Sequence, residues 1–145
     1  MIADSAVNIK NIVKVVTVYK GKLIIVKQFR DSTQEYTYEL PGGKVNGNEE
    51  IRIGAIRELE EETGLVTNEL IELGAFKVPA GNILTTLFFT NNIINRTTQS
   101  LDSDELIEVI DIDIETAFKK IGNGEWKDYR LGIGLILART RGLIS

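Results

Sequence analysis

Three glutamates in the middle of the chain have a spacing that could hold a metal ion. Glu58, Glu61 and Glu62 lie within residues 40–65, which read LPGGKVNGNEEIRIGAIRELEEETGL. On a helix, positions three and four apart project from one side. Like charges at this spacing weaken an isolated helix by roughly 0.2–0.5 kcal/mol per pair, so a compensating partner is expected. A divalent cation is the simplest such partner.

The residue types that are missing restrict the chemistry. The 145 residues include no cysteine and no histidine. Disulfides, thiolate catalysis, cysteine-bound zinc and imidazole acid–base catalysis are therefore excluded. A metal site would have to be built from oxygen, which suits Mg²⁺, Ca²⁺ or Mn²⁺. Any acid–base groups would be carboxylates, lysine or tyrosine.

The overall composition is typical of a single globular domain. Hydrophobic residues make up 43% of the chain and charged residues 26%. The net charge of −4 disfavours a broad nucleic-acid footprint. No stretch approaches the ~18–20 apolar residues that span a bilayer. The start, MIADSAVNIK, lacks the basic region and apolar run of a signal peptide, so we expect a cytoplasmic protein without nucleic-acid or membrane partners.

Residues on either side of the glutamates add to a cation site. Gly42 and Gly43 permit a sharp turn and offer a carbonyl that no side chain obstructs. Arg57 lies next to Glu58 and four positions before Glu61, where it could orient a carboxylate by a charge-assisted hydrogen bond. Such a site suits Mg²⁺ that bridges phosphate oxygens and activates a water. Taken alone, ELEEE would read as a solvated helix face, and the surrounding spacing argues against that interpretation.

The spacing resembles a known family signature, the Nudix box G-x5-E-x7-R-E-U-x-E-E-x-G-U, in which U is aliphatic. Every fixed position is filled, by Gly43, Glu49, Arg57, Glu58, Leu59, Glu61, Glu62, Gly64 and Leu65. The resemblance implies an α/β (α+β) fold, the Nudix α/β/α sandwich around a mixed sheet, as one domain over residues 1–145. It also implies metal-dependent hydrolysis of a nucleoside diphosphate linked to another group, by water attack at phosphorus.

The same resemblance suggests a role for each residue of the box. Glu58, Glu61 and Glu62 resemble ligands of Mg²⁺ or Mn²⁺, together with the carbonyl of Gly42. Arg57 resembles the arginine that orients these glutamates. Glu49, also in the box, corresponds to a structural or outer-sphere position. The general base varies within the family, so the box alone does not identify it.

Segments beside the box resemble the ADP-ribose pyrophosphatase branch of this family. Residues 26–30 (VKQFR) and 38–43 (YELPGG) are similar to its Q-[FY]-R and E-L-P-[AG]-G elements. Arg30 could bind a phosphate or ribose hydroxyl, or be a rim arginine at a strand end. Glu39 could accept from a sugar or amino group, or anchor the loop. The resemblance therefore predicts a nucleotide-sugar substrate.

Two further segments follow the branch pattern. Residues 102–109 (DSDELIEV) resemble its catalytic loop, which makes Glu105 our candidate general base or late metal ligand; the alternative is a solvated loop acid. Residues 124–128 (GEWKD) resemble the element that caps the last helix. The Ser-Pro-Gly of the branch is altered here to Val78-Pro79-Ala80-Gly81, one residue early, and Pro79 is a candidate substrate contact.

The resemblance leaves the substrate and the assembly open. A homodimer is implied by the resemblance alone. A base could stack on one of four aromatic side chains, for which the alternative is core or sheet packing: Tyr36, Tyr38, Phe76 and Phe88. The alternative activity is that of a nucleoside triphosphate pyrophosphohydrolase, which uses the same box. A non-catalytic nucleotide sensor is the third interpretation.

The elements that position these residues follow from apolar patterning and turn residues. Residues 1–10 are expected to form an arm or short edge strand, and 91–104 an exposed loop. The glutamate helix should begin near Asn48 or Glu49, with an asparagine cap, and end at Thr63-Gly64. Strands are expected over 12–19, 22–29, 35–40, 70–78, 83–90 and 106–112, and further helices over 114–121 and 129–140, the last capped by Asp128.

Overall fold

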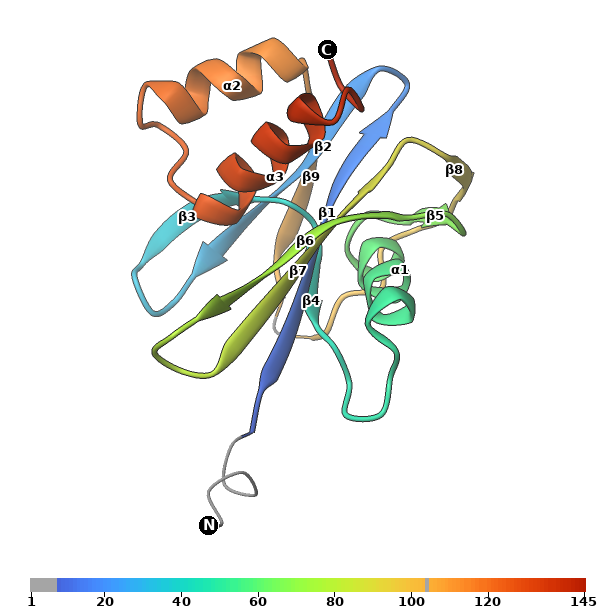
Figure 1. Cartoon of the computed structure of the whole chain (residues 1–145), viewed down its shortest axis with the longest axis vertical. Coiled ribbons are helices and arrows are strands. Elements are labelled where there is room, and N and C mark those ends of the chain that lie inside the picture. The colour runs from blue at the N-terminus through green and yellow to red at the C-terminus, as the bar shows by residue number, and fades with distance from the viewer. Residues whose placement is uncertain (1–7, 104) are drawn as a thin grey trace.

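The computed structural model describes residues 8–103 and 105–145, and most of its strands belong to one mixed sheet (Figure 1). Its strands are β1 (Lys10–Tyr19), β2 (Lys22–Arg30), β3 (Glu35–Glu39), β4 (Gly42–Lys44), β6 (Ile71–Val78), β7 (Ile83–Thr90) and β9 (Ile107–Ile112). A separate pair comprises β5 (Leu65–Thr67) and β8 (Ile93–Arg96). The helices are α1 (Ile51–Thr63), α2 (Ile114–Gly122) and α3 (Tyr129–Thr140).

The sheet lies between two helical layers. β1 runs parallel to β7, whereas its pairings with β2 and β4 are antiparallel. α1 covers one face, and α2 and α3 cover the other (Figure 1). On the α1 face, Val13 and Val15 pack with Ala55 and Leu59. This arrangement confirms the predicted α/β/α sandwich, and none of the described helices is long and apolar enough to cross a membrane.

The opposite face holds the larger apolar cluster. Successive side chains of a strand point to opposite faces, so Val16 packs on the other side of β1 from Val15. There it meets Leu131 and Leu135 of α3, both fully buried. Burying side chains of this size contributes roughly 1.5–3 kcal/mol each. The two clusters fix α1 and α3 against the sheet.

The glutamate helix begins later than the sequence predicted. Its N-cap is Glu50, which makes no side-chain capping bond, so the predicted asparagine cap was wrong. The preceding residues form a turn in which the Glu49 N–H donates to the Asn46 carbonyl at 3.0 Å. The Glu49 carboxylate accepts from the Asn46 N–H at 3.1 Å and so closes this turn. The predicted end was correct, because Gly64 takes a left-handed conformation, with φ of 77°.

Most other elements confirm the prediction, and the exceptions are short. Asp128 caps α3 by accepting from the N–H groups of Arg130 and Leu131. The sequence did not predict β4, β5 and β8, which have three or four residues each. β8 lies inside the segment expected to be a loop. Lys10 already belongs to β1, a strand inside the sheet rather than at its edge, and residues 1–7 of the expected arm lie outside the described residues.

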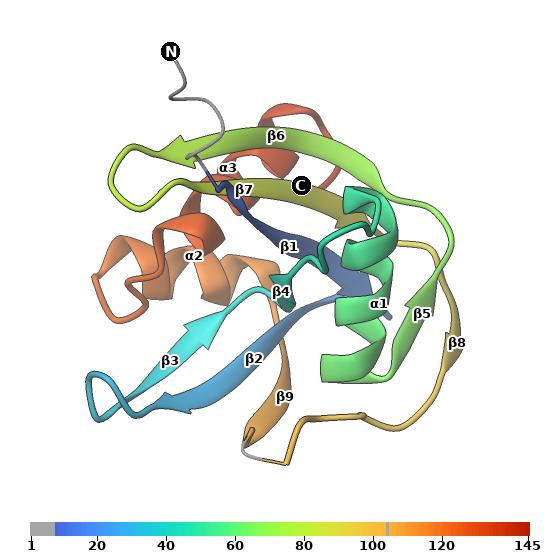
Figure 2. The same cartoon turned by 90° about the horizontal axis from the view of Figure 1, so that it is seen from below.

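The sheet separates between β1 and β2. These strands pair only beside their turn, at Val18 with Leu23 and Tyr19 with Lys22. Farther along, β1 pairs with β4 and β7, whereas β2 pairs with β3 and β9. Figure 2 shows the two strands diverging, with β4 between them. β4 and the glycine turn at its start therefore lie between the diverging parts of β1 and β2, with α1 packed beside them.

Candidate active site

A pocket of about 400 Å³ is lined by residues of both halves of the sheet, near the place where β1 and β2 separate. Side chains reach it from β1, β2, α1, α3 and the loop before β9, while β4 forms part of its wall. It is lined by Ile12, Lys14, Gln28, Arg30, Gly42, Gly43, Lys44, Glu58, Glu62, Asp102, Glu105 and Arg130. The structure therefore brings together most of the residues that the sequence singled out.

The α1 wall of the pocket carries two carboxylates in an environment that disfavours their charge. The Glu62 side chain is buried and accepts from the Gly42 N–H at 2.8 Å. Burial raises the pKa of Glu62 to about 7; Lys14 and the Gly42 N–H oppose this rise, while Glu58 and Glu105 add to it. Burial also raises the pKa of Glu58, against the opposing effect of Arg57. Negative charge on this wall lacks full compensation within the chain.

The glycine turn lets a carboxylate lie directly against the backbone of β4. A Cβ built on Gly43 would come within 2.5 Å of the Glu58 Oε2 atom. Any larger residue at this position would force Glu58 out of its place. The glycine of the motif therefore serves close approach of Glu58.

Arg57 links the helix to the loop that precedes it. Its Nε donates to Glu49 Oε2 at 2.8 Å, and its Nη2 donates to the Lys44 carbonyl at 3.1 Å. Its Nη1 donates to both oxygens of Glu61 at 3.1 Å and to Glu58 Oε1 at 3.2 Å. The hydrogen bond from Arg57 lowers the pKa of Glu49. Glu61, 40% exposed at its side chain, lies outside the pocket lining and faces Arg57.

A hard divalent cation fits the donor set of this wall, although the side chains do not form a ready cage. Within residues 8–103 and 105–145, no group of three or more Asp or Glu side chains is arranged to hold a metal ion. Glu58 and Glu62 nevertheless line one pocket with the backbone of Gly42. Their carboxylate oxygens are ligands that Mg²⁺ or Mn²⁺ prefers. A bound cation would also stabilise their charged forms, which the raised pKa values show to be disfavoured.

The cations that line the pocket form a second wall around one buried carboxylate, Glu39, which does not itself line the pocket. Its side chain is 2% exposed and receives Lys14 Nζ at 3.2 Å, Arg30 Nη2 at 2.8 Å and Arg130 Nη2 at 3.4 Å. Burial alone would raise its pKa, but Lys14 and hydrogen bonds from Arg30 and Thr37 outweigh that effect and lower it to about 2. Three cations on one carboxylate leave this wall positive. Glu39 thus anchors the wall, and the half-exposed Arg30 presents its guanidinium to the pocket.

Glu105 reaches the pocket from a loop that folds back on itself. Its N–H donates to the Asp102 carbonyl at 2.9 Å, and its Oε1 accepts from the Asp102 N–H at 2.9 Å. The carboxylate faces the same pocket as Glu58 and Glu62. These two bonds hold the Glu105 side chain against Asp102 within the loop.

Sequence reasoning gave no role to six residues that line the pocket: Ile12, Lys14, Gln28, Lys44, Asp102 and Arg130. For Lys14 a signal was present, because a lysine inside the apolar run IVKVVTVY needs a buried partner. For Arg130 none was available, because its bond to Glu39 spans 91 positions. Asp102 was quoted in its segment but given no role.

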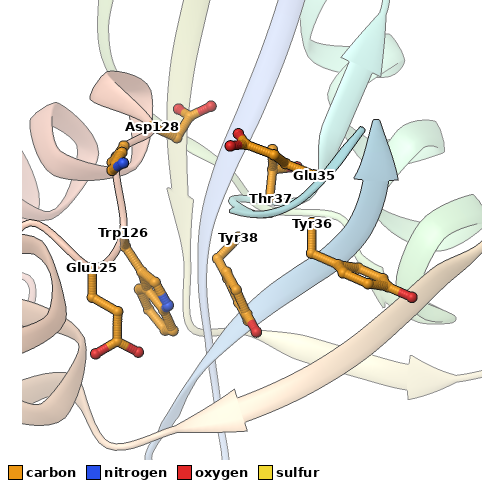
Figure 3. A pocket seen from close by; sticks show the side chains of 8 residues that line it. Glu35, Tyr36, Thr37, Tyr38, Glu125, Trp126 and Asp128 are labelled. Carbon is orange, nitrogen blue, oxygen red and sulfur yellow. The ribbon is translucent and has the colours of Figure 1, made fainter. Parts of the chain in front are cut away.

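Other predicted residues lie apart from the pocket. Pro79 is exposed in the turn that joins β6 and β7 and does not line it. Among the aromatic candidates, Phe88 is 1% exposed and belongs to the core. Tyr38 stacks on Trp126, with ring centroids 5.2 Å apart, whereas Tyr36 points away from this pair (Figure 3). Both tyrosines line a second pocket of about 490 Å³ between β3 and the start of α3.

Comparison with known families agrees with this geometry. The family model described as NUDIX domain matches residues 9–130, which is most of the chain. The chain therefore belongs to the Nudix family.

Individual relatives narrow the comparison. The ADP-ribose pyrophosphatase of Bacillus subtilis (strain 168) is 35% identical over 112 residues, which cover 75% of this chain and 60% of that protein. The methanol dehydrogenase activator of Bacillus methanolicus is 29% identical over 105 residues, which cover 70% of this chain and 57% of that protein. The chain thus spans about 60% of the length of these curated relatives.

Solved structures share the fold. An ADP compounds hydrolase superposes with a TM-score of 0.78 at 18% identity, covering 90% of this chain and 71% of that one. A MutT structure, from work on Aliivibrio salmonicida and Vibrio cholerae, gives a TM-score of 0.63 at 19% identity and covers 77% of this chain and 86% of that one. These similarities establish the architecture of the domain.

Proposed function

We propose that this chain hydrolyses the diphosphate bond of a nucleoside diphosphate linked to another group. One observation supports this proposal above all: a single pocket is lined by both carboxylates and cations. Glu58 and Glu62 line it together with Lys14, Arg30 and Arg130. A diphosphate is the ligand that suits both walls, since its oxygens pair with the cations and with a metal ion on the carboxylates.

The ion would be Mg²⁺ or Mn²⁺, held by Glu58 and Glu62 with the Gly42 carbonyl and, by family resemblance, Glu61. When bound, it polarises the phosphoryl oxygens and lowers the pKa of a coordinated water. Arg57 keeps α1 and the preceding loop in register through its bonds to Glu49 and the Lys44 carbonyl.

A side chain of this protein must accept the proton of the attacking water. We assign Glu105 as the general base, because its carboxylate lines the pocket beside Glu58 and Glu62. Its Oε1 already accepts from the Asp102 N–H, so Oε2 takes the proton of the attacking water. The water oxygen forms the new bond to phosphorus, and the bond between phosphorus and the bridging oxygen breaks. Arg30 and Lys14 orient the phosphate that leaves.

ADP-ribose or a related nucleoside diphosphate sugar is the substrate that we propose. The 35% identical relative from Bacillus subtilis carries the name ADP-ribose pyrophosphatase, which supports this choice. The pocket also adjoins a hollow of about 280 Å³, with which it shares Gln28, Arg30 and Glu105. That hollow gives room for a group joined to the diphosphate.

A substrate panel tests the proposal. The purified chain is incubated with Mg²⁺ and either ADP-ribose, other nucleoside diphosphate sugars or nucleoside triphosphates, and the products are separated by ion-exchange chromatography. We expect AMP and ribose 5-phosphate from ADP-ribose, and no turnover after chelation of the metal. Pyrophosphate released from a triphosphate would instead identify the triphosphate pyrophosphohydrolase. Tight nucleotide binding without any product would identify a sensor.

A further inference from the structure

The loop that carries Glu105 is bonded to the end of α1 by contacts that the proposed reaction does not use. The Thr97 N–H donates to the Gly64 carbonyl at 2.6 Å, and the Ser100 N–H donates to the Glu61 carbonyl at 2.8 Å. The last carbonyls of a helix lack partners within the helix, so donors from elsewhere must satisfy them. Here the donors come from the segment that leads to Glu105.

One side chain in this segment reaches two separate parts of the backbone. Gln99 Nε2 donates to the Glu62 carbonyl at 2.7 Å and to the Ile107 carbonyl at 3.0 Å. An amide nitrogen carries two N–H groups, and both acceptors here are carbonyls. The orientation of the amide is therefore determined by its partners.

These two bonds close the base of the Glu105 loop. The described residues of this loop, 100–103 and 105–106, lie between Gln99 and Ile107, where β9 begins. The Gln99 amide joins the start of β9 to the backbone of Glu62 on α1. Glu105 lies two positions before Ile107, so its place in the pocket depends on where this closure holds β9 and α1.

We propose that Gln99 is a positioning residue, which sets the place of Glu105 relative to Glu58 and Glu62. This inference rests on the proposed function, in which Glu105 is the base. Gln99 acts through Glu105 and does not itself take part in proton transfer. Gln99 also borders a separate hollow with Tyr36 and Leu106, so a direct contact with the substrate would appear in KM.

A double-mutant cycle tests this assignment. Gln99→Met keeps the length of the side chain and removes both donors. We expect kcat to fall about tenfold, with KM changed less than twofold, because the base is misplaced while binding is retained. In a Glu105→Gln background the same substitution should change kcat less than twofold. An equal fall in both backgrounds, or a change mainly in KM, would overturn the proposal.

Two further variants separate this role from a general loss of structure. Gln99→Glu keeps the shape but sets carboxylate oxygens against two carbonyls, so we expect a loss of kcat at least as large. The matched control is Asn92→Leu, which removes an exposed side-chain amide donor to Glu69 away from the pocket, and its kcat should be unchanged. A fall of kcat in the control equal to that in Gln99→Met would contradict the assignment.

Amide hydrogen exchange provides a measurement that does not depend on turnover. The N–H groups of Asp102 and Glu105 are both bonded within the loop. In Gln99→Met these two amides should exchange about tenfold faster, while the Gly42 amide, bonded to Glu62, should keep its rate. Unchanged exchange would refute the closure whatever the activity. Faster exchange in a chain that hydrolyses no substrate would refute the proposed function and leave the closure standing.

Discussion

Two buried glutamates, Glu62 in the pocket lining and Glu39 behind its cations, differ in how their charge is balanced. Glu39 and Glu62 are 2% and 6% exposed, so burial opposes ionisation of both. Even so, the pKa of Glu39 is about 2 and that of Glu62 is about 7. Glu39 is in contact with Lys14, Arg30 and Arg130, whereas the charges of Glu58 and Glu105 act on Glu62.

The comparison separates a structural carboxylate from one that needs a ligand. The charge of Glu39 is satisfied by cations of the chain itself, so Glu39 holds the wall together. The charge of Glu62 is opposed only in part by the Gly42 N–H and by the charge of Lys14, so a cation from outside the chain would complete its compensation. Both side chains are almost fully buried, so the charges of the neighbouring side chains decide whether the carboxylate is structural or needs a ligand.

The largest expected effect follows from neutralising the carboxylate that needs a ligand. Glu62→Gln should lower kcat by about 100-fold or more, because the site loses charge that would hold the metal ion and stabilise the transition state. Initial rates with ADP-ribose and Mg²⁺ measure the effect. Glu60→Gln, on the same helix but outside the pocket lining, is the matched control and should keep its rate. Near wild-type turnover in Glu62→Gln would show that Glu62 is no metal ligand.

Removing the charge of Glu39 should lower the stability of the fold. Glu39→Gln leaves Lys14, Arg30 and Arg130 without their shared anion, and breaking such a buried group typically costs about 3 kcal/mol. The free energy of unfolding in urea measures this loss. By contrast, Glu62→Gln relieves a buried charge and should not destabilise the metal-free chain at pH 8. If both variants lost the same stability, the distinction between the two walls would be wrong.

The same comparison has a pH dependence. A pKa lowered from 4.5 to about 2 on folding means that Glu39 stabilises the fold above pH 4.5. This contribution, on the order of 3 kcal/mol, is lost as the pH falls from 4.5 towards 2. Urea unfolding at several pH values should show a steeper acid loss in the wild-type chain than in Glu39→Gln. Parallel curves for the two proteins would refute the lowered pKa.

The sequence predicted the fold well where patterning is local. The run IVKVVTVY and the hairpin that follows indicated β1 and β2, and Asp128 indicated the start of α3. It could not predict β4 or β8, because strands of three or four polar or mixed residues depend on partners distant in the chain. The predicted asparagine cap of α1 was wrong because residues 46–49 form a turn closed by the Glu49 carboxylate, and the helix begins only after it.

The candidate site was predictable where its residues lie in one segment. Glu58, Glu61 and Glu62 share one helix, and two of them, Glu58 and Glu62, line the pocket, whereas Glu61 does not. The resemblance of the neighbouring segments had also singled out Arg30 and Glu39. The cationic wall joins residues of β1, β2, β3 and α3, and no local pattern relates Lys14 or Arg130 to Glu39. Only the fold brings these charges together.

Glu105 tests whether the acidic wall needs a third carboxylate for proton transfer. Glu105→Gln should lower kcat about 30-fold and leave KM within twofold, because the amide cannot accept the proton but keeps the shape of the loop. Full activity in this variant would reduce Glu105 to a solvated loop acid and leave the base to be found elsewhere on this wall.

The smallest expected effect concerns the exposed part of the cationic wall. Arg30 donates to both oxygens of Glu39, yet 42% of its side chain is exposed, so the guanidinium can also meet a phosphate. Arg30→Ala should raise KM about fivefold with little change in kcat, since a contact made equally in the ground and transition states affects binding alone. Arg30→Lys keeps the charge but not the planar fork, so its KM should lie between those of the wild-type chain and Arg30→Ala.

Arg139→Ala, at the far end of α3, controls for the loss of a surface cation and should leave KM unchanged. If Arg30→Ala lowered stability as much as Glu39→Gln while KM stayed constant, Arg30 would belong with Glu39 to the structural wall, and substrate contact would fall to Lys14 and Arg130.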